Sequence, residues 1–420
     1  RCPPLFFLLL MKVLRIIARL NVGGPARHVV WLTRGLEDDE FQSRLIAGTV
    51  PLGEEDMGYF ASENGVEPIF IPELSRELSI KDAISLFKIY REMSLFSPDI
   101  IHTHTAKAGT VGRAAAFLYR WLTPGTIVGR PRRVAVIHTF HGHVFHSYYG
   151  VLKTRLFLMI EKVLARVATD RIVTISAQQL DEIHGRFGVG RPGQFAVIPL
   201  GIDLEAFSFS ESDRKVLRDE IGAANDEIVV GFVGRLTEIK NLPLLIRSAR
   251  LARDKSAGEP KIRFVVIGDG NVRATIEKLA QEDGVAAAFT FLGNRPDVAG
   301  LLPGLDIIAL TSRNEGTPLS LIEAMAAGVP FISTAVGGVV DLAGSVVEER
   351  DNFTICKRGV LAEDDSDESF SAGLLYLAKS EKLRQSISIA GRVFVSEQYS
   401  KDRLVCDIRE LYRGLAGGDS

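Results

Sequence analysis

The chain has 420 residues, of which 46% are hydrophobic and 24% charged, and its formal net charge is −2. This composition is typical of a globular protein with two or three domains, and the near-neutral charge gives no reason to expect a nucleic-acid partner. Its three cysteines, Cys2, Cys356 and Cys406, are scattered without metal-ligand spacing, which suggests neither a disulfide framework nor a zinc site and fits a reducing cytoplasm.

The chain begins with an apolar run. The run extends from Leu5 to Met11, far short of the roughly 20 residues needed to span a bilayer. Because Met11 also opens an ordinary first strand, we expect residues 1–10 to be a leader outside the fold.

Positive charge is concentrated in one region. Residues 100–171 contain 11 Lys and Arg but only 2 Asp and Glu. Many basic stretches are simply solvated, but a local positive field also attracts phosphates or an anionic membrane surface. Together with a basic, apolar helix expected at 148–167, this predicts a peripheral position on the inner face of the plasma membrane.

The first half of the chain alternates buried strands with helices. Lys12–Ala18 predicts a strand, and a glycine turn at Asn21–Ala26 follows it before a helix near residues 26–36; such a turn either cradles a phosphate or simply closes the unit. Further strands are expected at Ser43–Val50, Pro68–Ile71, Pro98–His104, Arg133–His138, Asp170–Ser176 and Phe195–Pro199, with helices at 54–64, 80–95 and 107–119.

Histidines gather at the ends of two of these strands. His102 and His104 share one strand face, and residues 138–146 hold four of the chain's eight histidines. A metal site has to be considered, but this cluster contains no carboxylate or thiolate, so metal is not the favoured interpretation. Ligands bind at strand ends in α/β sheets, and we expect one or two of these histidines to contact substrate.

The second half repeats the alternation after a boundary in the charged, Ser-rich residues 204–226. Strands are expected at Ile228–Val233, Ile262–Ile267, Ala288–Leu292, Ile307–Thr311, Pro330–Ser333 and Val360–Leu361. The fold class is therefore α/β, with two doubly wound parallel sheets. The predicted domains are 11–205, 206–395 and a final segment, 396–420.

Charged residues follow the strands of the second sheet. Arg235 and Lys240 suit a diphosphate whose charge grows as a bond to it breaks. Glu315 and Glu323 are separated by seven residues, and Thr317 is predicted to cap a helix that has Pro318 at its first position. The positive end of that helix would favour a phosphate, and the carboxylates would accept hydroxyl protons from attached sugars.

Two other motifs are weaker. The glycine turn Gly268-Asp-Gly270 favours a dehydrogenase only slightly, because Arg273 replaces the third glycine of that fingerprint and no ribose-binding acid is evident. Asp365-Ser-Asp367 has the form of a metal-nucleotide motif, but its acidic surroundings favour a charged helix start.

Taken together, these residues resemble glycosyltransferase family 4, retaining enzymes with two Rossmann-like domains facing across a cleft (the GT-B fold). The resemblance covers about 11–415 and rests on EGTPLSLIEAMAAGVP, on GRLTEIKN and on the GGP turn. The histidine segments look most like the bacterial branch that builds capsule, exopolysaccharide and lipid-linked oligosaccharide.

The resemblance implies a role for each matched position. It implies a catalytic set of Arg235, Lys240, Glu315 and His141, with both cations on the donor diphosphate, Glu315 on the transferred sugar and His141 near the anomeric centre. It implies donor contacts, with Glu323 on the ribose, for Gly23, Gly24, Gly234, Gly268, Gly316, Thr317, Pro318, Leu319 and Glu323. It implies acceptor contacts for His102, His104, Lys107 and His143, no metal, and a final helix, Tyr399 to Leu415, that crosses back to the first domain.

The expected activity is transfer of a sugar, with retention, from a nucleotide-diphosphate sugar (UDP-linked) to a glycan or polyprenyl-diphosphate-linked acceptor in polysaccharide synthesis. No cofactor besides this co-substrate is expected. A nucleotide-sugar epimerase of the same fold and a non-catalytic sugar-nucleotide-binding protein remain as alternatives.

Overall fold

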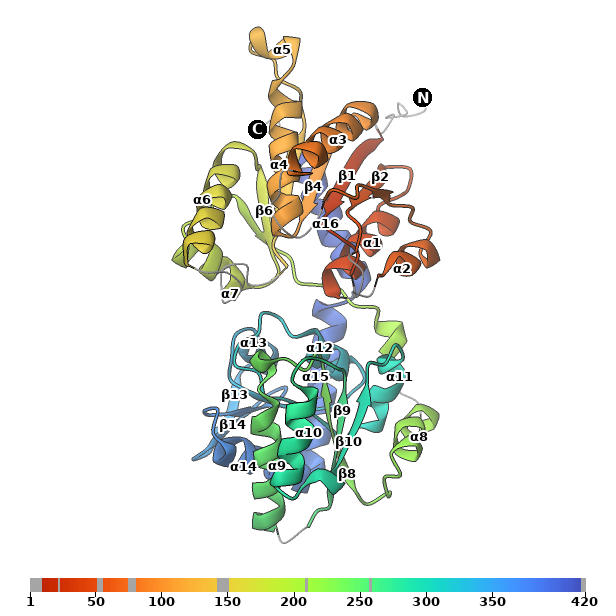
Figure 1. Cartoon of the computed structure of the whole chain (residues 1–420), viewed down its shortest axis with the longest axis vertical. Coiled ribbons are helices and arrows are strands. Elements are labelled where there is room, and N and C mark those ends of the chain that lie inside the picture. The colour runs from red at the N-terminus through yellow and green to blue at the C-terminus, as the bar shows by residue number, and fades with distance from the viewer. Residues whose placement is uncertain are drawn as a thin grey trace, which may run out of the picture. The chain divides into compact units, whose positions relative to one another are not determined.

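The computed structural model describes residues 10–21, 23–50, 56–74, 81–141, 151–207, 211–256 and 259–416. The chain forms two compact units (Figure 1). The first unit contains the residues up to Gly201 and those from Lys401 onward, and the second spans Ile202–Ser400. The chain's last helix therefore belongs to the unit that its first half builds.

A seven-stranded sheet of parallel strands, in the order β3-β2-β1-β4-β5-β6-β7, forms the first unit. Its strands are β1 (Met11–Ile17), β2 (Phe41–Ala47), β3 (Ile69–Phe70), β4 (Ile100–His104), β5 (Ala135–Thr139), β6 (Arg171–Thr174) and β7 (Phe195–Val197). Its helices are α1 (Gly24–Gly35), α2 (Gly58–Glu63), α3 (Lys81–Phe96), α4 (Ala106–Trp121), α5 (Pro124–Ile127), α6 (Val151–Val167), α7 (Ala177–Leu180), η1 (Asp181–Arg186) and α16 (Lys401–Ala416).

Alternation along the strands assigns each side chain to one face of this sheet. Ile101 and Val136 pack with helices α3 and α4, whereas their neighbours Ile100 and Ile137 pack with α1 and α16 on the other face. Successive strand residues point to opposite faces, so both faces need a helical layer, and near-continuous apolar strands result. His102 and His104 follow Ile100 at even spacing and therefore lie on the face that α1 and α16 cover.

An eight-stranded sheet, in the order β10-β9-β8-β11-β12-β15-β14-β13, forms the second unit. Its strands are β8 (Ile228–Val233), β9 (Ile262–Ile267), β10 (Phe289–Gly293), β11 (Ile307–Leu310), β12 (Phe331–Thr334), β13 (Val346–Glu349), β14 (Phe353–Cys356) and β15 (Val360–Ala362). Its helices are α8 (Glu211–Glu220), α9 (Leu242–Ser256), α10 (Arg273–Glu282), α11 (Val298–Leu301), α12 (Leu319–Ala326), α13 (Val339–Ala343), α14 (Asp367–Lys379) and α15 (Glu381–Gln398), with 3₁₀ turns η2 (Leu204–Phe207), η3 (Glu238–Lys240), η4 (Ala286–Ala288) and η5 (Leu302–Gly304).

The predicted α/β class with two doubly wound sheets is confirmed, with one difference at an edge. β13 and β14 are antiparallel to their neighbours and were not predicted. Every residue of β13, VVEE, is exposed, so the strand carries neither the apolar run nor the alternation that identifies a strand in a sequence. An antiparallel edge on an otherwise parallel sheet is common.

Each sheet has one point where the strand order reverses. In the first sheet this point lies between β1 and β4, and in the second between β8 and β11. In open α/β sheets, ligands bind beyond the carboxyl ends of the strands at this position, because the two following loops diverge there. The loops after β1, β4, β8 and β11 are therefore the places to look for a site.

No helix in the part of the chain that the structure describes combines the length and the apolar character needed to cross a membrane.

The first unit contains a fully buried ion pair between α4 and α6. Nη2 of Arg113 lies 2.7 and 2.6 Å from the two carboxylate oxygens of Glu161, and Arg113 also donates to the carbonyl of Gly109. We expect Glu161→Ala to lower the free energy of unfolding of this unit by about 3–5 kcal/mol, because it leaves a buried guanidinium without its partner. Chemical denaturation measures the change.

Two variants control for a general effect of losing a carboxylate. Glu282→Ala removes a carboxylate whose partner Lys278 is 74% exposed, and it should cost less than about 1 kcal/mol. The double variant Arg113→Leu/Glu161→Leu should recover most of the lost stability, since it removes both buried charges. Equal losses from Glu161→Ala and Glu282→Ala would contradict the prediction.

Candidate functional site

An ion pair joins the two loops at the reversal point of the second sheet. Lys240 ends the turn η3 after β8, and its ammonium pairs with the carboxylate of Glu315 in the loop after β11. The hydroxyl of Ser312 donates to the same carboxylate oxygen at 2.5 Å. The side chains of Lys240 and Glu315 are 20% and 11% exposed, so the pair is largely shielded while remaining reachable from solvent.

Three hydrogen bonds to backbone carbonyls hold the loops that carry this ion pair. Thr311 donates through its hydroxyl to the carbonyl of Lys240 at 2.9 Å, and the amide of Arg313 donates to the carbonyl of Ile239 at 2.9 Å. The hydroxyl of Thr334, at the end of β12, donates to the carbonyl of Ser312 at 2.6 Å. Three adjacent strand ends therefore hold the loops that carry Lys240 and Glu315.

Glycines allow close backbone approach at this edge. A Cβ on Gly268, whose φ is +134°, would lie 2.0 Å from the carbonyl oxygen of Gly234. A Cβ on Gly337, whose φ is +53°, would lie 1.8 Å from the carbonyl oxygen of Glu315. Both conformations are ones that L side chains rarely adopt, so these positions require glycine on two counts. Gly234 and Gly268, two expected donor contacts, thus lie against each other.

Helix α12 begins one residue later than predicted. Its first residue is Leu319 and its cap is Pro318, so the prediction of Thr317 as cap and Pro318 as first helical residue is wrong. No side chain caps this helix; instead the amide of Gly338 donates to the carbonyl of Gly316 at 2.9 Å and holds the approach to the helix. The loop packing replaces the threonine cap.

Glu323 lies on α12, half-buried, a little more than one turn after Leu319. Arg235 is exposed, and its guanidinium has no ion pair or hydrogen bond among the described residues. The structure therefore brings Lys240 and Glu315 into contact and places Arg235 on the same β8 loop without joining it to them.

The motif at Asp365–Asp367 is a helix start. Ser366 caps α14 by accepting a hydrogen bond from the amide of Ser369, and the carboxylate of Asp367 pairs with Arg247. This agrees with the favoured interpretation of the acidic run.

In the first unit, Gly23 precedes α1 with a φ of +153°, and Gly24 is the first residue of that helix. Lys107, near the start of α4, is buried, and its ammonium lies 2.5 Å from the carboxylate of Asp82 on α3. These positions stay predicted donor and acceptor contacts; the geometry of Lys107 gives it a protein partner.

His102 is fully buried and has a partner at each ring nitrogen. Its Nδ1 lies 2.7 Å from the Tyr412 hydroxyl on α16, and its Nε2 lies 2.7 Å from the hydroxyl of Thr139. The Tyr412 hydroxyl also accepts from Arg15 at 3.4 Å. His102 thus links the closing helix to the sheet, and its expected contact with an acceptor stays a prediction without support from this geometry.

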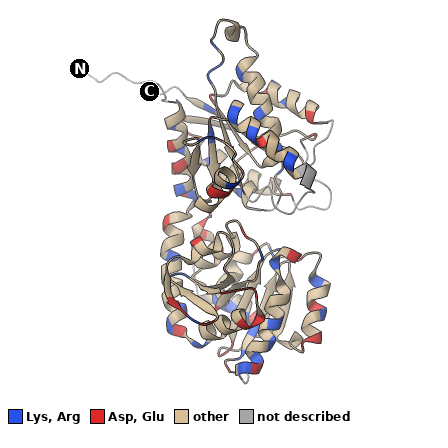
Figure 2. Ribbon diagram, turned by 90° about the vertical axis from the view of Figure 1, so that its left-hand side faces the viewer, with Lys and Arg blue, Asp and Glu red and all other residues tan. Residues whose placement is uncertain are grey.

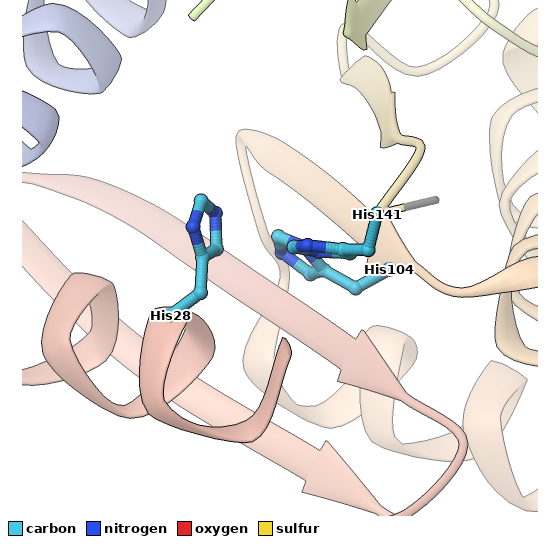
Figure 3. Close-up of side chains that lie close together, drawn as sticks. All are labelled: His28, His104 and His141. Atoms are coloured by element: carbon cyan, nitrogen blue, oxygen red, sulfur yellow. The ribbon is translucent and has the colours of Figure 1, made fainter. Parts of the chain in front are cut away.

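Three other imidazoles meet at the reversal point of the first sheet (Figure 3). His28 comes from α1, His104 ends β4 and His141 follows β5. Nδ1 of His104 lies 3.0 Å from Nε2 of His141, and the ring of His28 meets that of His141 edge-on with centroids 4.7 Å apart. The register of β4 with β1 and β5, which pairs His104 with Ile17 and Thr139, brings these residues together.

Burial keeps this histidine cluster (His28, His104 and His141) uncharged. Desolvation lowers the pKa of His28 and of His104 well below 6.5, and the neighbouring imidazoles add to the shift. Burial lowers the pKa of His141 to about 4; its Nδ1 has no contact with solvent although the residue as a whole is half-buried. All three are therefore neutral near pH 7.

His28 and Ser312 were missed in the sequence. His28 lies four residues after Gly24 on the helix that leaves the glycine turn, and the expected convergence of strand-end loops could have indicated it. Ser312 directly follows the strand predicted at Ile307–Thr311, and this position at a strand end could have indicated it. His138, in the segment 138–146, is buried on the opposite face, 2.9 Å from the Thr103 hydroxyl. His143 lies outside the described residues.

Comparison with known proteins matches both halves of the chain. The family model described as Glycosyltransferase Family 4 matches residues 22–206, and the one described as Glycosyl transferases group 1 matches residues 213–394. The UDP-Gal:alpha-D-GlcNAc-diphosphoundecaprenol alpha-1,3-galactosyltransferase of Escherichia coli is 30% identical over 278 residues, which cover 66% of this chain and 68% of that protein. The putative glycosyltransferase EpsD of Bacillus subtilis is 26% identical, covering 79% of this chain and 82% of that protein.

Solved structures share the fold. Anabaena HepE in complex with UDP superimposes with a TM-score of 0.77 at 19% identity, covering 96% of this chain and 100% of that one. WaaG, a glycosyltransferase involved in lipopolysaccharide biosynthesis, gives a TM-score of 0.67 at 17% identity, with 95% and 99% covered. With the two family models and the Escherichia coli relative, this likeness shows that the chain belongs to glycosyltransferase family 4 and has its GT-B fold.

Proposed function

We propose that this glycosyltransferase moves a sugar, with retention of configuration, from a UDP-sugar to a glycan or polyprenyl-diphosphate-linked acceptor in cell-surface polysaccharide synthesis. The observation that carries the proposal is the ion pair of Lys240 with Glu315 at the reversal point of the second sheet. A cation and a carboxylate held together there match the two ends of a sugar diphosphate.

The donor diphosphate would bind to Lys240 and Arg235. An ammonium has three N–H donors, so Lys240 can keep its ion pair with Glu315 and also donate to a phosphate oxygen. Arg235, exposed on the same loop, adds a guanidinium that can grip a phosphate with two parallel hydrogen bonds. Both cations stabilise the diphosphate most as its negative charge grows, which lowers the barrier to departure without a metal ion.

Glu315 and Glu323 would recognise the sugars of the donor. The hydroxyl of Ser312 and the ammonium of Lys240 hold one oxygen of the Glu315 carboxylate, and this orients the group toward hydroxyls of the transferred sugar. Glu323 on α12 would accept from the ribose. His141 would lie beside the anomeric centre, and no carboxylate is assigned as a nucleophile; departure and attack would occur on the same face of the sugar.

Two relatives support the choice of substrates. The Escherichia coli relative, by its name, uses UDP-galactose and a diphosphoundecaprenol-linked acceptor, and HepE was solved with UDP and with UDP-glucose. An epimerase would alter the sugar of a UDP-sugar in the absence of any acceptor, whereas a transferase gives slow hydrolysis at most. A binding protein would bind the donor without transfer to any of a panel of acceptors.

We expect Lys240→Ala to lower turnover by about 10²–10³-fold, because it removes one preorganised cation from the leaving diphosphate. Transfer from UDP-galactose to a polyprenyl-diphosphate-linked GlcNAc measures the rate, and NMR of the product tests retention of the anomeric configuration. Lys278→Ala, which removes an ammonium that is 74% exposed, is the charge-matched control and should keep the wild-type rate. An intact turnover in Lys240→Ala would refute the assignment.

We expect UDP to stabilise the Gly268→Ala variant against heat much less than the unaltered protein. The added Cβ would displace the loops after β8 and β9, where UDP is proposed to bind. In the unaltered chain, UDP at 100 times its dissociation constant should raise the free energy of unfolding by about 2.7 kcal/mol, which is seen as a rise in the thermal midpoint. Gly300→Ala, where a Cβ meets no atom within 4 Å, is the matched control. The same rise in both variants would contradict the role of Gly268.

A protruding tip of the first unit supports peripheral membrane binding. Helix α5 lies at the tip in Figure 1, and around it Trp121, Leu122, Ile127 and Val128 are 41%, 62%, 89% and 72% exposed. Blue segments, which mark Lys and Arg, lie beside this tip in Figure 2. Exposed Arg130 and Arg133 follow the tip in the chain. Apolar side chains next to arginines suit an anionic bilayer surface.

We expect the protein to sediment with vesicles that contain anionic lipid and much less with neutral vesicles. Arg130→Gln/Arg133→Gln should weaken this binding roughly 30-fold, since each basic residue near such a surface contributes about 1 kcal/mol. The control Lys278→Gln/Lys382→Gln removes two exposed charges from the second unit and should bind as the unaltered chain does. Sedimentation that ignores lipid charge would count against membrane binding.

A further inference from the structure

The histidine cluster contains more nitrogen atoms than the described part of the chain satisfies. Both ring nitrogens of His28, Nε2 of His104 and Nδ1 of His141 are buried without a hydrogen-bond partner there. A buried polar atom without a partner costs about 1–3 kcal/mol. A neutral imidazole has one lone pair, and that of His28 points to no partner among the described residues beside the other two rings, so it is free for a further ligand.

We propose that His28, His104 and His141 bind a divalent transition-metal ion of the Zn²⁺ class, with three imidazole ligands and a fourth position left to an oxygen ligand. One ligand nitrogen from each residue lies within 4.8 Å of the others. Each ligand comes from a different element, α1, β4 and the loop after β5, so the ion would join the two strand ends to the first helix (Figure 3).

The distances come close to those of a tetrahedral site. Imidazole nitrogens bind Zn²⁺ at about 2.0–2.1 Å, which places neighbouring ligand nitrogens roughly 3.3 Å apart in a tetrahedron. His104 Nδ1 and His141 Nε2 are 3.0 Å apart, so they need to move apart by a few tenths of an ångström. The ligand atoms of the three residues lie within 4.8 Å of one another, so the ring of His28 has to move closer to this pair when the ion binds.

The tautomers required for binding are accessible. In the hydrogen bond between His104 and His141, one nitrogen carries a proton, whereas both must offer a lone pair to a metal ion. His104 Nε2 and His141 Nδ1 have no partner among the described residues and can carry the protons instead. Each ring stays neutral, which is the form that coordinates a metal ion and the form that burial favours.

The site differs from the one considered in the sequence. Residues 138–146 were set aside as a metal site because they contain no carboxylate or thiolate, but the ligands here come from three separate segments. Three histidines with one open position are a known coordination set for zinc. Three neutral ligands leave the ion with its full positive charge, so the fourth ligand is favoured to be an anionic oxygen, such as hydroxide, a carboxylate or a phosphate.

The ion takes no step in the transfer proposed above, so the two proposals fail separately. The test uses the full chain without a histidine tag, treated with chelator and then titrated with Co²⁺, whose visible absorption reports its coordination. We expect one Co²⁺ per chain, with the intense visible bands of a four- or five-coordinate ion, and displacement by one equivalent of Zn²⁺. Absence of saturable binding in the folded chain would overturn the proposal.

Variants decide whether the three histidines are the ligands. His28→Gln and His141→Gln should each weaken Co²⁺ binding by at least about tenfold and alter the absorption bands. His184→Gln is the control, because His184 belongs to the same unit but bonds the carbonyl of Val189 at 3.1 Å, outside the cluster. Circular dichroism shows whether each variant folds. Because His141 is only half-buried, His141→Gln is the substitution least expected to disturb folding. Equal affinity in all three variants would show adventitious binding and overturn the assignment.

Discussion

The ion pair between Lys240 and Glu315 is the constraint on which the second unit's site depends. Neither charge would be stable in this shielded position alone, because a charge taken out of water needs a partner and further hydrogen bonds. Ser312 supplies one hydrogen bond to the carboxylate, and the loops after β9 and β12 press their glycines against the backbones of Gly234 and Glu315. The pair therefore stays preorganised, and a diphosphate would meet groups that need little rearrangement.

The reversal point of the first sheet has the same strand geometry, but the side chains that meet there are uncharged. Strand ends again converge there, but the groups that meet are neutral imidazoles whose pKa values burial has lowered. A charged ion pair and an uncharged histidine cluster thus occupy equivalent positions on two similar sheets. The fold sets the position of a ligand site, and the side chains at the strand ends determine the charge of the ligand that it can bind.

The sequence allowed the sheets to be predicted well because their strands are buried on both faces. Ile228–Val233 and Ile262–Ile267 match β8 and β9 at both ends, since each is a mainly apolar run that follows a charged residue and ends before a glycine. The helix start at Pro318 was misplaced because loop packing by Gly338, distant in sequence, replaces the threonine cap. The pairing of Lys240 with Glu315 follows from topology, whereas the meeting of His28 with His104 depends on side-chain directions that no spacing rule gives.

The strand β4 connects the histidine cluster to the end of the chain. His102 and His104 are two residues apart and point to the same face, where the first contacts Tyr412 and the second contacts His141. Placing Tyr412 against His102 and Arg15 brings α16 onto this face, so the last helix completes the layer that buries the cluster. The low polarity that keeps the imidazoles neutral thus depends on a helix some 300 residues away in sequence, as the separation of 310 residues between His102 and Tyr412 shows. The rings of His102 and Tyr412 also meet edge-on, with centroids 5.8 Å apart, so a change at Tyr412 alters both the packing and the hydrogen bonding of His102.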